Sequence, residues 1–147
     1  MRALLVIFMV ATAFASHAQT PTAFTLPSRA AVKLEKTLKK TQAEVITDRK
    51  PNFVHVAARP LINRILVQST TDFLAISSNG PTKEAFLQSL GTSLTNLSPL
   101  VKKMEEREDL AVYYQSLLEI VGLESSEGLL SAFVVKKPIS ASVSVKN

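Results

Sequence analysis

The chain has 147 residues, a formal net charge of +5 and no cysteine. Without cysteine there are no disulfides, no thiol catalysis and no thiolate metal sites, so we expect core packing alone to hold the fold. The charge is polarised. Nine basic and three acidic residues lie between Arg29 and Arg64, whereas seven acidic residues and one basic residue lie between Glu105 and Glu127. The two halves should therefore present different surfaces to partners.

Residues 1–18 have the pattern of a signal peptide for export. Arg2 supplies the positive start, residues 3–14 form an apolar run, and the small-residue motif A-S-H-A at 15–18 favours a cut directly after it. A cut after Ala15 fits nearly as well, and an uncleaved anchor is the alternative. The run is short for a bilayer span. We therefore expect an exported protein, periplasmic or secreted, with no transmembrane span after cleavage.

We expect residues 19–27 to form a disordered leader, because they are rich in Thr and Pro and lack periodicity. Ser28 can cap the helix that follows, at about residues 29–43. This helix has a thin apolar stripe. On the opposite side we expect a basic stripe, made of Arg29, Lys33, Lys36 and Lys40.

The basic stripe is the candidate surface for an anionic partner, either an envelope protein or an anionic envelope component. An ordinary solvated helix face is the alternative. A nucleic-acid partner is not expected, because the protein is exported and no aromatic platform lies near the lysines.

Local patterns predict three further long helices. Residues 53–56 favour a short strand or extended segment, and Pro60 suits the first turn of a second helix that extends to about Ile76. After a break, Thr82 can cap a third helix that ends near Leu97. A fourth helix, about residues 105–121, has acidic first turns and a wide apolar face, so we expect it to lie centrally in the core.

The stretch I-V-G-L-E-S-S-E-G-L-L at residues 120–130 could be a helix joint or a serine site. Gly122 suits a left-handed helix end, and Ser125 or Ser126 can cap a short fifth helix at about 127–133. A catalytic serine is the weaker hypothesis, because the spacing does not fit G-x-S-x-G and the base would have to be His55 or a Lys or Glu of raised basicity. We expect no cofactor. We expect no metal site either, since the acidic run at 105–109 lacks a calcium loop.

Three segments together resemble a small bacterial family. They are F-L-x-I-S from Phe73, N-G-P-T-K-E-A-F-L from Asn79, and the long segment E-D-L-A-V-Y-Y-Q-S-L-L-E-I-V-G-L-E-S-S-E-G-L-L from Glu108. The resemblance extends over about 61–133 and is to a domain of unknown function. It implies a helical fold and assigns no catalytic residue.

The sequence thus predicts an all-α domain at residues 28–135, with four main helices and a short fifth in a small bundle. The tail at 136–147 alternates apolar and small polar residues. It is either loose or paired in a minor β-hairpin. For function we expect a non-enzymatic interaction or binding module, with a hydrolase or other enzyme of unknown chemistry as the alternative.

Overall fold

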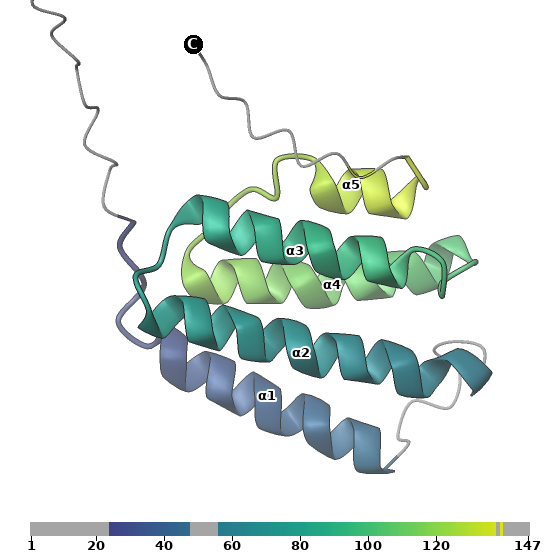
Figure 1. Cartoon of the computed structure of the whole chain (residues 1–147), viewed down its shortest axis with the longest axis horizontal. Helices are drawn as coiled ribbons and strands as arrows, with labels where there is room; N and C mark the ends of the chain where they lie inside the picture. Colours follow the sequence, from purple (N-terminus) through teal and green to yellow (C-terminus); the bar gives the residue numbers. More distant parts are fainter. Residues whose placement is uncertain (1–23, 48–55, 138, 140–147) are drawn as a thin grey trace, which may run out of the picture.

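The structure, a computed structural model, describes residues 24–47, 56–137 and 139 (Figure 1). Within these ranges it contains helices and no strands. The elements are α1 (Ala30–Thr47), a 3-10 turn η1 (Val56–Ala58), α2 (Arg59–Ser78), α3 (Lys83–Leu97), α4 (Met104–Val121) and α5 (Leu129–Val134). The predicted all-α class, with four main helices and a short fifth in a small bundle, is confirmed.

The four long helices run alternately back and forth, and α1, α2 and α3 lie side by side in chain order (Figure 1). Helix α4 lies behind them and packs against α1 and α2, while α5 covers α3 and α4. One end of the bundle therefore collects the start of α1, the end of α2, the start of α3 and the end of α4.

Helix α4 supplies the centre of the core, as its wide apolar face predicts. Its side chains Leu110, Leu117, Leu118 and Val121 are fully buried. Each such aliphatic side chain contributes about 1.5–3 kcal/mol when it leaves water. The buried residues that meet them from the other helices are Leu34, Ile62, Leu66, Phe73, Phe86, Leu90, Leu94, Leu97, Leu129, Leu130 and Phe133.

The segment before α1 differs from the expected disordered leader. Phe24 and Leu26 are half-buried against the core, and the ring centroid of Phe24 lies 5.8 Å from that of Phe86 on α3. The last four residues of the expected leader therefore lie against the core in the structure. Composition suggested disorder, but two large apolar side chains suffice to dock the segment.

Two other boundaries differ from the sequence predictions. Helix α1 ends at Thr47 rather than near Ala43, and Val56 begins the 3-10 turn η1 instead of ending a strand. The remainder of the predicted strand, at 53–55, lies outside the described residues. So do the signal peptide pattern, residues 19–23 and the tail beyond Ile139.

Hydroxyl groups form a buried link between α2, α3 and α4. The Tyr114 hydroxyl oxygen lies 2.8 Å from Ser69 Oγ, and Ser69 Oγ lies 2.7 Å from Ser93 Oγ. All three residues are buried, and each comes from a different helix. A satisfied buried network of this kind fixes how helices align, because a shift would leave polar atoms without partners.

A second hydroxyl link lies at the rim of the core. The half-buried Tyr113 has its hydroxyl oxygen 2.6 Å from Thr70 Oγ1 on α2 and 3.0 Å from Thr41 Oγ1 on α1. The Tyr113 and Tyr114 rings meet edge to face, with centroids 5.6 Å apart. The pair therefore anchors α4 to each of the other long helices.

Arg107 closes the far end of the bundle. Its side chain, 2% exposed, donates hydrogen bonds to the carbonyl oxygens of Phe133 at 2.6 Å, Ser98 at 2.8 Å and Val101 at 2.8 Å. Its guanidinium carbon also lies 4.9 Å from the centre of the Phe133 ring. One side chain thus joins α4 to the α3–α4 connection and to the last turn of α5.

Replacing Arg107 by Met should lower the free energy of unfolding by about 3 kcal/mol. The change leaves buried carbonyl oxygens without donors, and hydrogen bonds to charged groups are worth about 1.5–3 kcal/mol each. Urea denaturation measures the loss. The control is Arg64→Met on an exposed position of α2, which should change stability by no more than about 0.5 kcal/mol. Equal losses from both variants would contradict this role of Arg107.

The Tyr114 phenol should make the free energy of unfolding depend on pH in the alkaline range. Burial raises the pKa of Tyr114 well above its ordinary value, against the smaller opposing effect of its hydrogen bonds to Ser69 and Ser93. The unfolded chain then loses this proton first, so the contribution is complete below about pH 10 and is lost as pH rises above it.

Replacing Tyr114 by Phe should therefore cost about 1 kcal/mol near pH 8, because a buried hydrogen bond is lost. The difference in unfolding free energy between the two proteins should narrow above about pH 10. Denaturant curves at pH 8 and at pH 11 test this. Two stability profiles that stay parallel across that range would contradict it.

Candidate functional site

Most of the basic stripe lies on a flank of α1, beside its buried face. Arg29 and Lys33 directly precede the buried Ala30 and Leu34, and Lys40 directly precedes the buried Thr41. One residue turns a helix by about 100°, so these three residues lie at the side of the buried face. Lys36, two residues after the buried Leu34, lies nearer the predicted opposite side, and the outermost face also carries Lys39 and Val32, which is 67% exposed.

All four residues of the basic stripe are exposed. Between Arg29 and Ala43 there are five basic residues, and Glu35 is the acidic one. Because the apolar face of α1 is buried in the bundle, the helix offers a partner its charge and very little apolar surface. This arrangement suits contact with an anionic surface rather than insertion into a membrane.

The acidic start of α4 stabilises the helix. Glu105 and Glu106 lie in its first turn, where the helix dipole favours negative charge. The backbone N–H of Lys103 donates to the Glu106 carboxylate at 3.3 Å. No group of three or more His, Asp or Glu side chains within the described ranges is placed to hold a metal ion.

Gly122 ends α4 in the left-handed conformation, with φ of 81°. Its N–H donates to the Glu119 carbonyl at 3.1 Å, and the N–H of the buried Leu123 donates to the Leu118 carbonyl at 2.9 Å. This is the hydrogen-bond pattern of a helix end that reverses the chain. A Cβ at Gly122 would also lie 3.1 Å from Pro27 Cγ, so the docked N-terminal segment approaches this turn closely.

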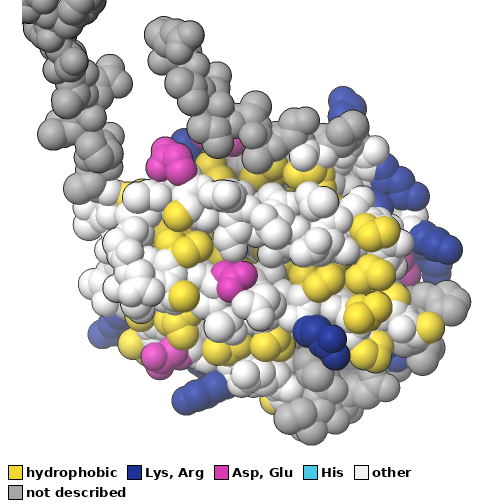
Figure 2. Space-filling model, viewed as in Figure 1, with side chains coloured by type: hydrophobic (Ala, Val, Ile, Leu, Met, Phe, Trp, Pro, Cys, Tyr) yellow, Lys and Arg dark blue, Asp and Glu magenta, His cyan; other side chains and the backbone are white. Residues whose placement is uncertain are grey.

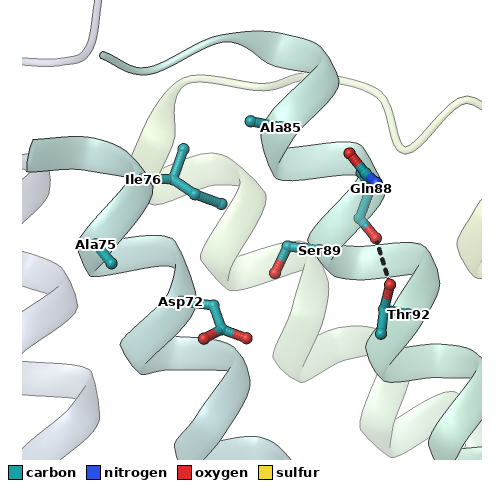
Figure 3. A pocket seen from close by; sticks show the side chains of 7 residues that line it. All are labelled: Asp72, Ala75, Ile76, Ala85, Gln88, Ser89 and Thr92. Atoms are coloured by element: carbon teal, nitrogen blue, oxygen red, sulfur yellow. Dashed lines mark hydrogen bonds between the residues drawn. The ribbon is translucent and has the colours of Figure 1, made fainter. Parts of the chain in front are cut away.

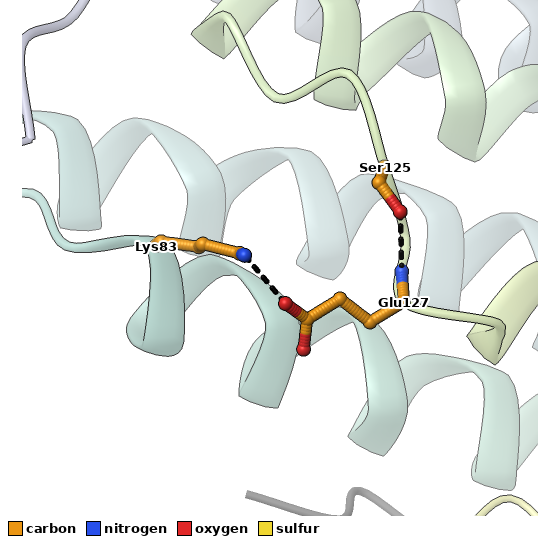
Figure 4. A network of polar contacts seen from close by, with 3 residues as sticks. All are labelled: Lys83, Ser125 and Glu127. Atoms are coloured by element: carbon orange, nitrogen blue, oxygen red, sulfur yellow. Dashed lines mark hydrogen bonds and ion pairs between the residues drawn. The ribbon is translucent and has the colours of Figure 1, made fainter. Parts of the chain in front are cut away.

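The two serines of the stretch have separate tasks. Ser125 Oγ accepts from the N–H of Glu127 at 3.0 Å (Figure 4), and Ser126 Oγ accepts from the N–H of Leu130 at 3.4 Å. Helix α5 begins at Leu129, and its N-cap is Gly128. The expected helix start at 127 is therefore wrong by two residues. Ser125 closes a turn before the helix and does not cap it.

An ion pair holds this loop against α3. The ammonium of Lys83, in the first turn of α3, contacts the Glu127 carboxylate (Figure 4). The hydrogen bond and the charge of Glu127 raise the pKa of Lys83. Both side chains are well exposed, so the pair adds orientation more than stability. Glu127 itself has a left-handed backbone with φ of 51°.

The described part of this loop shows no arrangement of side chains that supports a catalytic serine. Ser125 is exposed, and its hydroxyl oxygen accepts a hydrogen bond from the backbone N–H of Glu127. His55, one of the candidate bases, lies outside the described residues.

The structure reveals one feature that the sequence analysis missed, an open groove of about 450 Å³ between α2 and α3 (Figure 3). Alanine and isoleucine side chains line part of it. The polar side chains are concentrated along α3, with one carboxylate from α2. The lining residues are Asp72, Ala75, Ile76, Ala85, Gln88, Ser89 and Thr92.

Residues 25–138 match a family described as a domain of unknown function, DUF4844. The chain belongs to this family. The match confirms the resemblance to a domain of unknown function and extends further than the sequence suggested, since it begins within the docked N-terminal segment and includes α1. No curated protein and no solved structure matches the chain.

The DUF4844 match takes in all five helices that the structure describes, together with the basic stripe and the α2–α3 groove. Both candidate surfaces are therefore parts of the family domain and not additions to it. Among the described helices, none has the combination of length and hydrophobicity that a membrane span needs.

Substituting Ala at Gly122 and at Gly80 should separate the cost of a left-handed backbone conformation from the cost of crowding by Pro27. Both glycines have positive φ, 81° and 87°, but only a Cβ at Gly122 would press on Pro27. The left-handed conformation costs a residue with a Cβ about 1–2 kcal/mol. We therefore expect a loss of about 1 kcal/mol for Gly80→Ala and a clearly larger loss for Gly122→Ala.

Thermal or urea unfolding measures both losses. The double variant Pro27→Ala, Gly122→Ala should recover part of the excess, because the crowding atoms are gone. If both glycine variants lower the free energy of unfolding by the same amount, crowding by Pro27 does not contribute to the cost of Gly122→Ala.

Proposed function

We propose that this DUF4844 protein is an exported, non-enzymatic binding module whose basic stripe on α1 contacts an anionic partner in the cell envelope. The observation that carries the proposal is the exposure of Arg29, Lys33, Lys36 and Lys40 along one side of a helix whose apolar face is already buried. A charged surface of this kind steers and orients a partner.

Export is supported by the pattern of residues 1–18, with a positive start, an apolar run and a small-residue cut site. The lack of cysteine is consistent with a domain that folds without an oxidising step. The partner is accordingly sought in the envelope, as an acidic protein surface or an anionic envelope component.

The strength of such binding should depend on salt. Near an anionic surface each Lys or Arg contributes about 1 kcal/mol, and the Debye length is about 8 Å at physiological ionic strength. In Figure 2 several Lys and Arg side chains lie towards the lower edge of the molecule, on the side where Figure 1 places α1. Basic groups there can approach a partner without obstruction from the helical core.

The test is recovery of partners from the native host. The tagged protein, expressed with its own N-terminus, is purified at physiological salt and at high salt, and the retained material is identified and quantified. The variant Lys33→Glu, Lys36→Glu should retain at least about tenfold less material at physiological salt, because two attractive contacts become repulsive.

The matched control is Lys102→Glu, Lys137→Glu, which makes the same change in net charge at exposed positions away from α1. It should retain as much as the unmodified protein, and circular dichroism should show equal helix content in all three. Retention that is unaffected by reversal at Lys33 and Lys36 would contradict the proposal.

A further inference from the structure

The groove between α2 and α3 combines one negative charge with an apolar wall (Figure 3). Asp72 is the charged residue among those that line it, and Ala75, Ile76 and Ala85 supply apolar surface. Its volume of about 450 Å³ lies in the range of small-molecule sites. Charge and shape together favour a compact ligand with a cationic end and an aliphatic body.

The Asp72 carboxylate is held in place by its own helix. Gln68 Nε2 donates to Asp72 Oδ1 at 2.7 Å, one turn earlier on α2. No other described residue donates a hydrogen bond to this carboxylate, so it retains acceptor capacity towards the groove. Figure 3 shows the side chain directed into the space between α2 and α3.

Ser89, on the facing helix, has a buried hydroxyl with no partner among the described residues. Most other hydroxyls of these two helices donate to the carbonyl four residues earlier, as Thr92 does to Gln88 and Ser77 does to Phe73. The Ser89 hydroxyl makes no such bond and points towards the side of the groove on which Asp72 lies (Figure 3). A buried polar atom without a partner requires an explanation, and a water molecule or a donor group of a ligand would each supply one.

We propose that this groove binds a primary ammonium group on a short aliphatic chain. The ammonium donates hydrogen bonds to the Asp72 carboxylate and, once the Ser89 side chain turns into the groove, to Ser89 Oγ, and the chain lies against Ala75, Ile76 and Ala85. An ammonium has three donors, so it can serve both oxygens at once. A metal ion is less suitable, because one carboxylate and one hydroxyl are far fewer oxygen ligands than calcium requires.

The test is a titration of the isotope-labelled full chain with pentylammonium chloride, followed by amide chemical shifts. We expect saturable shifts that centre on Asp72 and Ser89, with millimolar affinity because the groove is open. At constant ionic strength, 1-pentanol should bind at least fivefold more weakly and pentanoate should not bind. Equal binding of the alcohol, or no saturable shift with the ammonium, would overturn the proposal.

Substitutions of the two groove residues test whether pentylammonium binds at the proposed site. Asp72→Asn keeps the shape of the side chain and should weaken pentylammonium binding at least fivefold, and Ser89→Ala should weaken it about twofold. The matched control is Asp109→Asn, which removes an exposed carboxylate on α4 and should leave the affinity unchanged. An Asp72→Asn protein that binds as well as the unmodified chain would overturn the proposal.

The same chemistry could come from a free amine or from the lysine side chain of a partner. A parallel titration with N-acetyl-lysine N-methylamide distinguishes the two. Tighter binding than pentylammonium supports a lysine side chain as the occupant, and weaker binding supports a free amine.

Discussion

Arg107, a buried cation that meets no carboxylate among the described residues, fixes one end of this bundle. Arg107 lies near the N-terminus of α4, where the helix dipole disfavours positive charge. The carbonyl oxygens of two other helix ends stabilise this charge instead. Arg107 donates to Ser98, the C-cap of α3, and to Phe133, in the last turn of α5. Carbonyls at helix C-termini have no partner within their own helix and carry partial negative charge. The guanidinium thus satisfies the ends of two helices, and burial lowers its pKa without supplying a counter-ion.

Local signals predicted the helices well where they act alone. Thr82 caps α3 as expected, with its side chain accepting from the N–H of Ala85 at 3.1 Å, and Gly122 takes the left-handed conformation at the end of α4. Local structure was predicted less well where contacts between distant parts of the chain determine it. Phe24 packs because Phe86 is there to receive it, and no pattern within residues 19–27 could show that.

The roles of several polar residues were also not predictable from local sequence. Ser69 and Thr70 lower helix propensity when considered alone, yet in the bundle they meet the hydroxyls of Tyr114 and Tyr113. The members of the basic stripe were identified from spacing, but the place of most of them on a flank depends on which side of α1 is buried. The unpartnered hydroxyl of Ser89 has no signature in the sequence at all, since serine in a helix ordinarily bonds to its own backbone.

The two candidate surfaces have opposite charge and are separated by a helix. The basic stripe belongs to α1, the groove lies between α2 and α3, and α2 stands between them (Figure 1). A helix with its side chains is about 10 Å across, which is close to the Debye length at physiological salt. Charges on one surface are therefore largely screened from the other. The net charge of +5 consequently predicts the behaviour of neither surface, and an anionic partner on α1 need not compete with a cationic ligand in the groove.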